Sequence, residues 1–206
     1  LHHLLTEIDY PSLSGIEGVE WDAVELPSQF MENFGWHRET LDLIATHWRS
    51  GEALPEALFQ RMLAAKHFQA GLFLVRQLEF ALFDFRLHLE FDPARGARVH
   101  ELLAEVRGEV SVIQPPAWQR FANAFTHIFS GGYSAGYYSY LWAEVLSADA
   151  FARFEAEGIT NAETGRAFRG EVLAVGGSRP ALDSFVAFRG REPDPAALLR
   201  SYGLAA

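Results

Sequence analysis

Cysteine is absent from the 206-residue sequence. The chain therefore has no thiol that could form a disulfide, act as a nucleophile or bind zinc. Runs of lysine or arginine are also absent, and 17 basic residues stand against 27 acidic ones, for a formal net charge of −10. This composition argues against nucleic acid and anionic membranes as partners.

Long apolar runs are missing as well. The sequence contains no run of 18 apolar residues, so no transmembrane helix is predicted. The sequence has no phosphate-binding loop, no dinucleotide fingerprint, no Gly-x-Ser-x-Gly motif and no recognisable signal peptide. The lack of cysteine is compatible with a reducing compartment, and we expect a cytoplasmic protein.

The sequence has ample material for a core. Hydrophobic residues make up 49% of the chain and aromatic residues 14%, including 17 phenylalanines. Apolar periodicity and helix start and stop signals predict an all-α fold, organised as one helical domain over residues 1–206. The helices expected with the clearest limits cover residues 27–35, 38–49, 55–66, 67–91, 94–112, 118–125, 151–157, 161–175, 181–189 and 195–202.

The most apolar stretch, residues 67–91, has apolar residues on every face, so we expect a central helix. Its charged residues need partners, because burying an unpaired charge is very unfavourable. Arg76 with Glu79, and Asp84 with His88, have helical spacings that allow contact.

The stretch 19–36 contains a carboxylate among apolar neighbours. On a helix, Glu25, Ser28, Gln29 and Glu32 share one face, because they are spaced at i, i+3, i+4 and i+7. Two interpretations stay open at this point. The face is the solvent side of an amphipathic helix, or it carries an acidic ligand into a cleft.

The stretch 127–142 combines glycines with four tyrosines. The spacing of Tyr133, Tyr137 and Tyr140 lets all three lie on one side of a helix beside a flexible glycine loop. A neutral phenol can donate a hydrogen bond to a developing oxyanion. An aromatic core stripe with hydroxyls at its rim fits the pattern equally well.

Four segments resemble one enzyme family. Asp-Ala-Val-Glu-Leu-Pro-Ser-Gln-Phe-Met-Glu-Asn (22–33) and the glycine–tyrosine stretch (127–142) are similar to motifs of the thimet oligopeptidase / oligopeptidase A family of zinc peptidases. Shorter similarities lie at 1–6 and 188–193. We expect the first of these, which contains His2 and His3, to be an exposed, frayed terminus.

The resemblance implies a zinc metalloendopeptidase that hydrolyses internal bonds of short peptides. It implies that Glu25 is a zinc ligand, that Tyr137 and Tyr140 stabilise the oxyanion, and that His127 and Tyr133 bind the peptide backbone. The family's other two zinc ligands and its general base lie on a His-Glu-x-x-His helix upstream, which this sequence does not contain. The chain is therefore expected to be a C-terminal fragment, inactive alone.

Several partner expectations follow from the missing helix. Zinc belongs to the parent enzyme, and the fragment alone should bind it weakly because Glu25 is a single ligand. The amino-terminal part of the same enzyme is the expected partner. Without it, an apolar surface around residues 21–34 and 127–142 should be exposed and could support a homodimer. The alternative function is a catalytically dead helical module that binds peptides or a partner protein.

Overall fold

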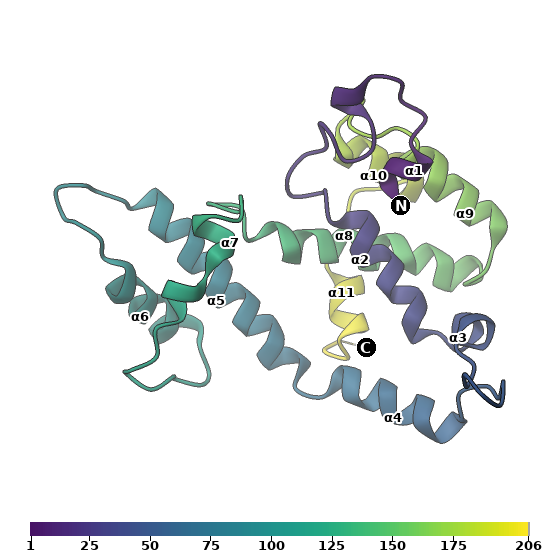
Figure 1. Cartoon of the computed structure of the whole chain (residues 1–206), viewed down its shortest axis with the longest axis horizontal. Coiled ribbons are helices and arrows are strands. Elements are labelled where there is room, and N and C mark those ends of the chain that lie inside the picture. The colour runs from purple at the N-terminus through teal and green to yellow at the C-terminus, as the bar shows by residue number, and fades with distance from the viewer. Residues whose placement is uncertain (206) are drawn as a thin grey trace. The chain divides into compact units, whose positions relative to one another are not determined.

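The computed structural model describes residues 1–205, which form helices joined by turns (Figure 1). Within this described part the only β-type pairing is an isolated antiparallel bridge between Thr46 and Ala53. The prediction of an all-α fold is confirmed. No helix among the described residues has the length and apolar character needed to cross a membrane.

The chain divides into two compact units, each with its own apolar core. The first unit contains residues 1–68 and 142–205, and the second contains residues 69–141. The single domain expected over residues 1–206 stays a prediction.

The first unit is built from short helices and one long one. Its elements are α1 (His2–Leu5), η1 (Pro11–Leu13), α2 (Leu26–Asn33), η2 (Phe34–Trp36), α3 (Arg38–Ile44), α4 (Glu56–His67), most of α8 (Ser139–Glu157), α9 (Ala162–Phe168), the π-helical η4 (Arg169–Leu173), α10 (Ala181–Arg189) and α11 (Ala196–Ser201). Phe30 of α2 lies at the centre of the core, stacked on Phe168 with ring centroids 3.9 Å apart. This packing fixes α2, and with it the residues at its start.

The N-terminal segment lies directly on a glycine pair. The amide of Gly177 donates to the carbonyl of Leu13 at 2.9 Å, and the amide of Glu7 donates to the carbonyl of Ala174 at 2.8 Å. A side chain at Gly177 would place its Cβ 2.4 Å from the carbonyl oxygen of Glu17. Glycine is therefore required for the close approach that leads the chain toward α2.

The second unit consists of α5 (Ala70–Leu89), α6 (Val99–Val110), η3 (Phe121–Ala124), α7 (Thr126–Phe129) and the residues leading into α8. Helices α5 and α6 lie side by side (Figure 1). Phe83 and Val106 are fully buried between them.

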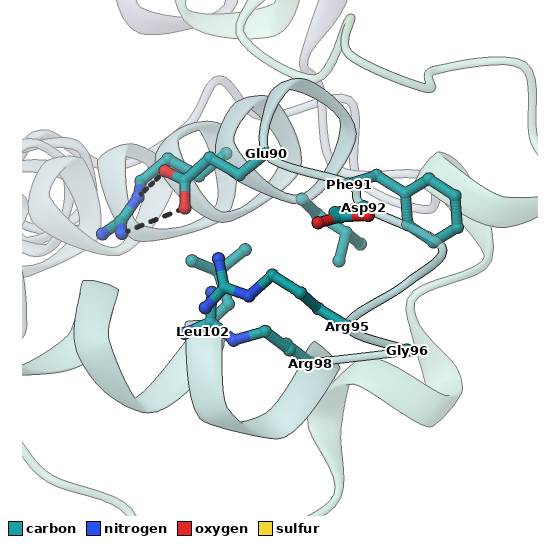
Figure 2. A pocket seen from close by; sticks show the side chains of 9 residues that line it. Glu90, Phe91, Asp92, Arg95, Gly96, Arg98 and Leu102 are labelled. Carbon is teal, nitrogen blue, oxygen red and sulfur yellow. Dashed lines mark hydrogen bonds and ion pairs between the residues drawn. The ribbon is translucent and has the colours of Figure 1, made fainter.

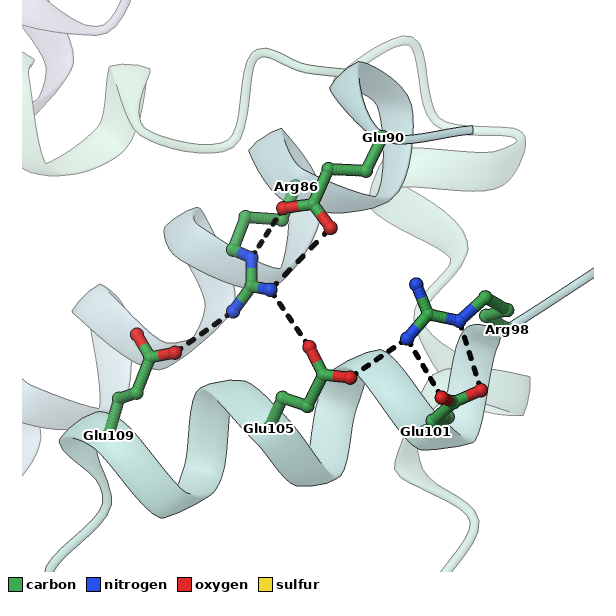
Figure 3. Close-up of polar contacts among 6 residues, drawn as sticks. All are labelled: Arg86, Glu90, Arg98, Glu101, Glu105 and Glu109. Carbon is green, nitrogen blue, oxygen red and sulfur yellow. Dashed lines mark hydrogen bonds and ion pairs between the residues drawn. The ribbon is translucent and has the colours of Figure 1, made fainter. Parts of the chain in front are cut away.

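An ion-pair network joins these two helices (Figure 3). Arg86 of α5 contacts Glu90 at 2.7 Å on its own helix, and Glu105 at 2.8 Å and Glu109 at 3.1 Å on α6. Arg98 extends the network by contacting Glu105 at 2.8 Å. The glutamates of this network are exposed to water, which screens the charges, so each pair adds little to stability.

Local signals located several helix ends correctly. Asn161 caps α9 by accepting the amides of Glu163 and Thr164 at 2.9 and 3.3 Å. Gly190 and Gly203 have positive φ angles of 76° and 68° after α10 and α11. The predicted contacts within α5 are also confirmed, since Arg76 lies 2.6 Å from Glu79 and His88 lies 3.0 Å from Asp84.

Other expectations are wrong. The helix expected over 38–49 ends at Ile44, and the one expected over 118–125 is only the 3₁₀ turn η3. The helix expected from residue 94 begins at Val99, because Asp92 accepts the amide of Ala94 at 2.9 Å in a local turn and Gly96 takes a φ of 69°.

The apolar stretch 67–91 does not form a helix buried on every side. Gln69, with a φ of 55°, separates α4 from α5. Several large apolar side chains of α5 are exposed: Phe73, Leu78, Leu82, Phe85 and Leu89. Conversely, His2 is buried within the first unit rather than frayed.

Candidate active site

Glu25 lies in the first unit and directly precedes α2. The Ser28 hydroxyl donates to Glu25 Oε2 at 2.8 Å, so the two polar residues that the sequence placed on one face do meet. On the other side of α2, Leu26 and Phe30 are buried in the core. The core therefore anchors the helix, and the serine helps to orient the half-buried carboxylate.

Zinc needs three protein ligands in its usual catalytic sites. Among residues 1–205, no group of three or more His, Cys, Asp or Glu side chains is arranged to hold a metal ion. Glu25 supplies one carboxylate, so the residues described here do not by themselves fit zinc.

The polar face of α2 continues into a cavity of about 100 Å³ within the first unit. Asn33 on this face donates to the Ser147 hydroxyl of α8 at 3.0 Å. Burial raises the pKa of Glu144, which accepts a 2.6 Å hydrogen bond from the Tyr202 hydroxyl. Burial also lowers the pKa of Lys66, which lines the same cavity. The sequence did not predict that these polar residues line one cavity, because they come from distant segments: α2, α4, α8 and the residues after α11.

Four aromatic residues of the second unit gather into one group, the His–Tyr cluster (His127, Tyr133, Tyr137 and Tyr140). The rings of Tyr133 and Tyr140 are stacked 4.6 Å apart, and those of Tyr137 and Tyr140 meet edge to face at 5.3 Å. The His127 ring lies 5.8 Å from Tyr137 and 6.1 Å from both Tyr133 and Tyr140. The structure thus brings together four of the five residues singled out from the sequence, while Glu25 belongs to the other unit.

The glycine loop between α7 and α8 builds this cluster. The amide of Tyr133 donates to the carbonyl of His127 at 2.9 Å, which turns the chain back on itself. Gly131 is needed there, because a Cβ at this position would lie 2.9 Å from the Cα of His127. The turn sets the Tyr133 side chain beside the His127 ring.

The expected tyrosine helix is wrong in detail. Helix α8 begins at Ser139, so only Tyr140 lies on it, in its first turn, while Tyr133 and Tyr137 lie in the preceding turns. The cause is a buried group on α5: the carboxylate of Asp84 accepts the amides of Ala135 and Tyr137, both at 2.9 Å. Gln77, also on α5, accepts the Tyr137 hydroxyl at 3.0 Å. Sequence reasoning missed this role of Asp84 and missed Gln77 altogether.

A small hollow of the second unit lies between the end of α5 and the start of α6. Figure 2 shows it lined by Glu90, Phe91, Arg95 and Arg98 among others. Its volume is about 20 Å³. That space holds about one water molecule and is far too small for a peptide side chain.

Comparison with known proteins gives one consistent result. Residues 1–204 match the model of peptidase family M3. The chain is 59% identical over 204 residues to oligopeptidase A of Escherichia coli, and 50% identical over 210 residues to a protein of Arabidopsis thaliana named probable cytosolic oligopeptidase A. It is 36% identical over 205 residues to saccharolysin of Saccharomyces cerevisiae.

These alignments cover nearly the whole chain but only part of each relative. They include 99%, 100% and 99% of the chain, and 30%, 30% and 29% of the respective relatives. The chain thus spans about 30% of the length of the curated proteins that it matches. The resemblance inferred from the two long motifs is confirmed.

Proposed function

This chain belongs to peptidase family M3, and we propose that it is part of a zinc metalloendopeptidase, similar to oligopeptidase A, that hydrolyses internal bonds of short peptides. The observation that carries this proposal is the His–Tyr cluster. Its three phenols and one imidazole meet within a single loop-and-helix segment, with five ring pairs at centroid distances of 4.6 to 6.1 Å. Such a group can bind a peptide backbone and donate to an oxyanion.

In the proposed enzyme each residue has a separate task. Tyr140, with Tyr137 as the alternative, donates a hydrogen bond to the oxygen that becomes negative when water attacks the peptide carbonyl. His127, which is exposed, and Tyr133 hold the peptide backbone. Glu25 is one ligand of a zinc ion, whose bound state would supply Lewis-acid activation of water.

The remaining zinc ligands and the general base come, in this proposal, from the rest of the peptidase, which is the proposed partner of this chain. Short peptides are the proposed substrates. A cytoplasmic location is proposed from the relative named as cytosolic. Large exposed apolar side chains at Trp21, Met31, Phe129 and Trp142 support association with the rest of the enzyme, or of two copies when that part is missing.

The test uses the full-length protein that the gene encodes. We expect Glu25→Gln to lose both zinc, measured by elemental analysis, and hydrolysis of a quenched fluorescent peptide. Glu32→Gln is the matched control, because Glu32 is an exposed glutamate on the same face of α2. It should keep zinc and most of the activity. A wild-type protein that binds the peptide without cleaving it would instead favour the binding module.

A further inference from the structure

Asp84 of α5 has a carboxylate that is completely buried in the second unit. Its Oδ1 accepts the amide of Ala135 and its Oδ2 accepts the amide of Tyr137, both at 2.9 Å. The His88 ring, one turn further along α5, lies 3.0 Å from Oδ1. Each carboxylate oxygen is therefore bonded to the loop that carries the His–Tyr cluster.

This loop needs an external support. Ala135 has a φ of 54°, a left-handed conformation that is unfavourable for a residue with a Cβ. Gly131, Gly132 and Gly136 add backbone freedom that a loop of this length does not restrict by itself. Hydrogen bonds to an ionised carboxylate are about twice as strong as neutral ones, so Asp84 can hold the unfavourable conformation.

A second support comes from the same helix. Gln77 precedes Asp84 by two turns, which places both residues on one face of α5. Its Oε1 accepts the Tyr137 hydroxyl at 3.0 Å. The main chain of Tyr137 is thus bonded to Asp84 and its phenol to Gln77, at two points of one rigid helix.

We propose that Asp84 and Gln77 are positioning residues. They fix Tyr137, whose ring meets that of Tyr140 edge to face, and so hold Tyr140 in the orientation needed to donate to an oxyanion. The expected effect on kcat rests on the proposed peptidase function, whereas the expected hold of Asp84 on the loop amides does not. A displacement of about 1 Å in a catalytic group can lower the rate about 10²-fold. Two hydrogen-bonded supports on a helix are a means of preventing it.

The first experiment measures amide hydrogen exchange by NMR in the 206-residue chain. In Asp84→Asn only the carbonyl oxygen of the side chain can accept a hydrogen bond. The NH₂ group replaces the second oxygen, so one of the two loop amides loses its acceptor. In Asp84→Asn we expect the Ala135 and Tyr137 amides to exchange at least tenfold faster. The matched control is Glu79→Gln, because Glu79 is a buried carboxylate of the same helix that binds Arg107 and Ser111 of the α6 region rather than the loop.

The second experiment measures steady-state kinetics in the full-length protein. We expect Asp84→Asn to lower kcat about 10- to 100-fold with little change in KM, while Glu79→Gln changes kcat less than about threefold. Gln77→Leu, at a half-buried site, should lower kcat about tenfold and leave the stability of the chain near normal. It keeps the proposal testable if Asp84→Asn does not fold.

The outcomes separate the two proposals. Unchanged loop exchange in Asp84→Asn, or equal acceleration in Glu79→Gln, overturns the positioning role. An unchanged kcat in Gln77→Leu also overturns it. If the wild-type protein cleaves no peptide but Asp84→Asn still releases the loop amides selectively, the peptidase function fails and the structural role of Asp84 stands.

Discussion

Arg191 binds the fully buried carboxylate of Asp149 through both terminal nitrogens, Nη1 to Oδ2 at 2.7 Å and Nη2 to Oδ1 at 2.6 Å. Arg189 adds a contact at 3.0 Å and the amide of Asp194 adds one at 2.8 Å. Both arginines belong to the segment 188–193, one of those that resembled the peptidase family. The segment therefore has a structural task, which is to hold the chain after α10 against α8.

Removing this carboxylate should be strongly destabilising. We expect Asp149→Ala to lower the free energy of unfolding by about 3–5 kcal/mol, because it leaves two arginines without their buried partner. Arg169→Ala is the control within the same unit, since it breaks the exposed pair with Glu7 and should change stability by less than about 1 kcal/mol. Urea unfolding followed by circular dichroism measures both. Equal effects of the two variants would contradict this prediction.

Two carboxylates should respond to pH with opposite sign. For Asp149, burial acts to raise the pKa, but the bonds from Arg191, Asp194 and Arg189 outweigh it and lower the pKa below its ordinary 3.8. Its stabilisation is present above pH 3.8 and is lost as the pH falls through the folded-state value. For Glu144, burial raises the pKa above 4.5, so the folded state loses stability as the pH rises from 4.5 through that value.

Glu144→Gln tests this difference. The amide oxygen of Gln can still accept the Tyr202 hydroxyl, while the buried negative charge is gone. We expect the variant to be more stable than the wild type at pH 7, with the difference vanishing below pH 4.5. Each unit of pKa shift corresponds to about 1.4 kcal/mol. Thermal unfolding at pH 7 and pH 4 measures it, and a variant that is less stable at pH 7 would show that the charge of Glu144 stabilises the fold.

The sequence predicted those features of the fold that residues close by in the chain determine. Asn161 caps a helix through amides two and three residues away, and Gly190 ends one by its own backbone conformation. The start of α8 has a distant cause. Asp84 holds Ala135 and Tyr137 from 51 and 53 residues away, so no spacing rule within 127–142 could show that the helix begins only at Ser139.

In the candidate site, too, some residues could be predicted from the sequence and others could not. The residue types at Glu25, His127 and Tyr140 could be selected from the sequence because long motifs resemble those of a known family. Their supports could not be selected. Gln77 lies 60 residues from Tyr137, and a lone glutamine in an apolar helix carries no signal of its partner. The sequence predicted the contact between Asp84 and His88, because residues four apart face each other on a helix. It did not predict that Asp84 also accepts amides of the loop before α8.

The glycine pair under the N-terminal segment allows a sharp test of close packing. In Gly177→Ala the new Cβ would lie 2.4 Å from Glu17 O and 2.5 Å from the carbonyl carbon of Gly18, both backbone atoms. We expect a loss of stability of several kcal/mol or failure to fold. Gly165→Ala is the control, because that site in α9 has nothing within 4 Å and alanine favours helix by about 1 kcal/mol. Thermal unfolding of both variants decides it, and a neutral Gly177→Ala would mean that the segment 13–18 moves away easily.

Zinc binding by the 206-residue chain should be weak. Glu25 supplies one ligand, and the usual catalytic site needs three from the protein. We expect isothermal titration calorimetry to show no stoichiometric binding at micromolar zinc, and Glu25→Ala to titrate like the wild type. Tight one-to-one binding that Glu25→Ala abolishes would contradict the prediction and would place further ligands within this chain.

The tyrosines of the intact peptidase should differ in their kinetic roles. Tyr140 lies at the centre of the His–Tyr cluster, with ring contacts to His127, Tyr133 and Tyr137. A donor to the oxyanion acts on the transition state, so its loss should lower kcat more than it changes KM. We expect Tyr140→Phe to lower kcat about 10²–10³-fold, with unchanged zinc content and a nearly unchanged KM. Steady-state kinetics of the full-length protein with a quenched fluorescent peptide measures this.

Matched variants distinguish the roles within the cluster. Tyr133→Phe should affect KM more than kcat, because Tyr133 precedes the support from Asp84 and is the proposed contact to the peptide backbone. Tyr138→Phe is the control, since Tyr138 packs on Phe85 with ring centroids 5.2 Å apart and belongs to no proposed step. If Tyr137→Phe loses kcat while Tyr140→Phe keeps it, the oxyanion donor is Tyr137, and its hydroxyl must then turn from Gln77 to the oxyanion. If neither substitution lowers kcat, the phenols only pack against one another, and the cluster is an aromatic core with polar edges.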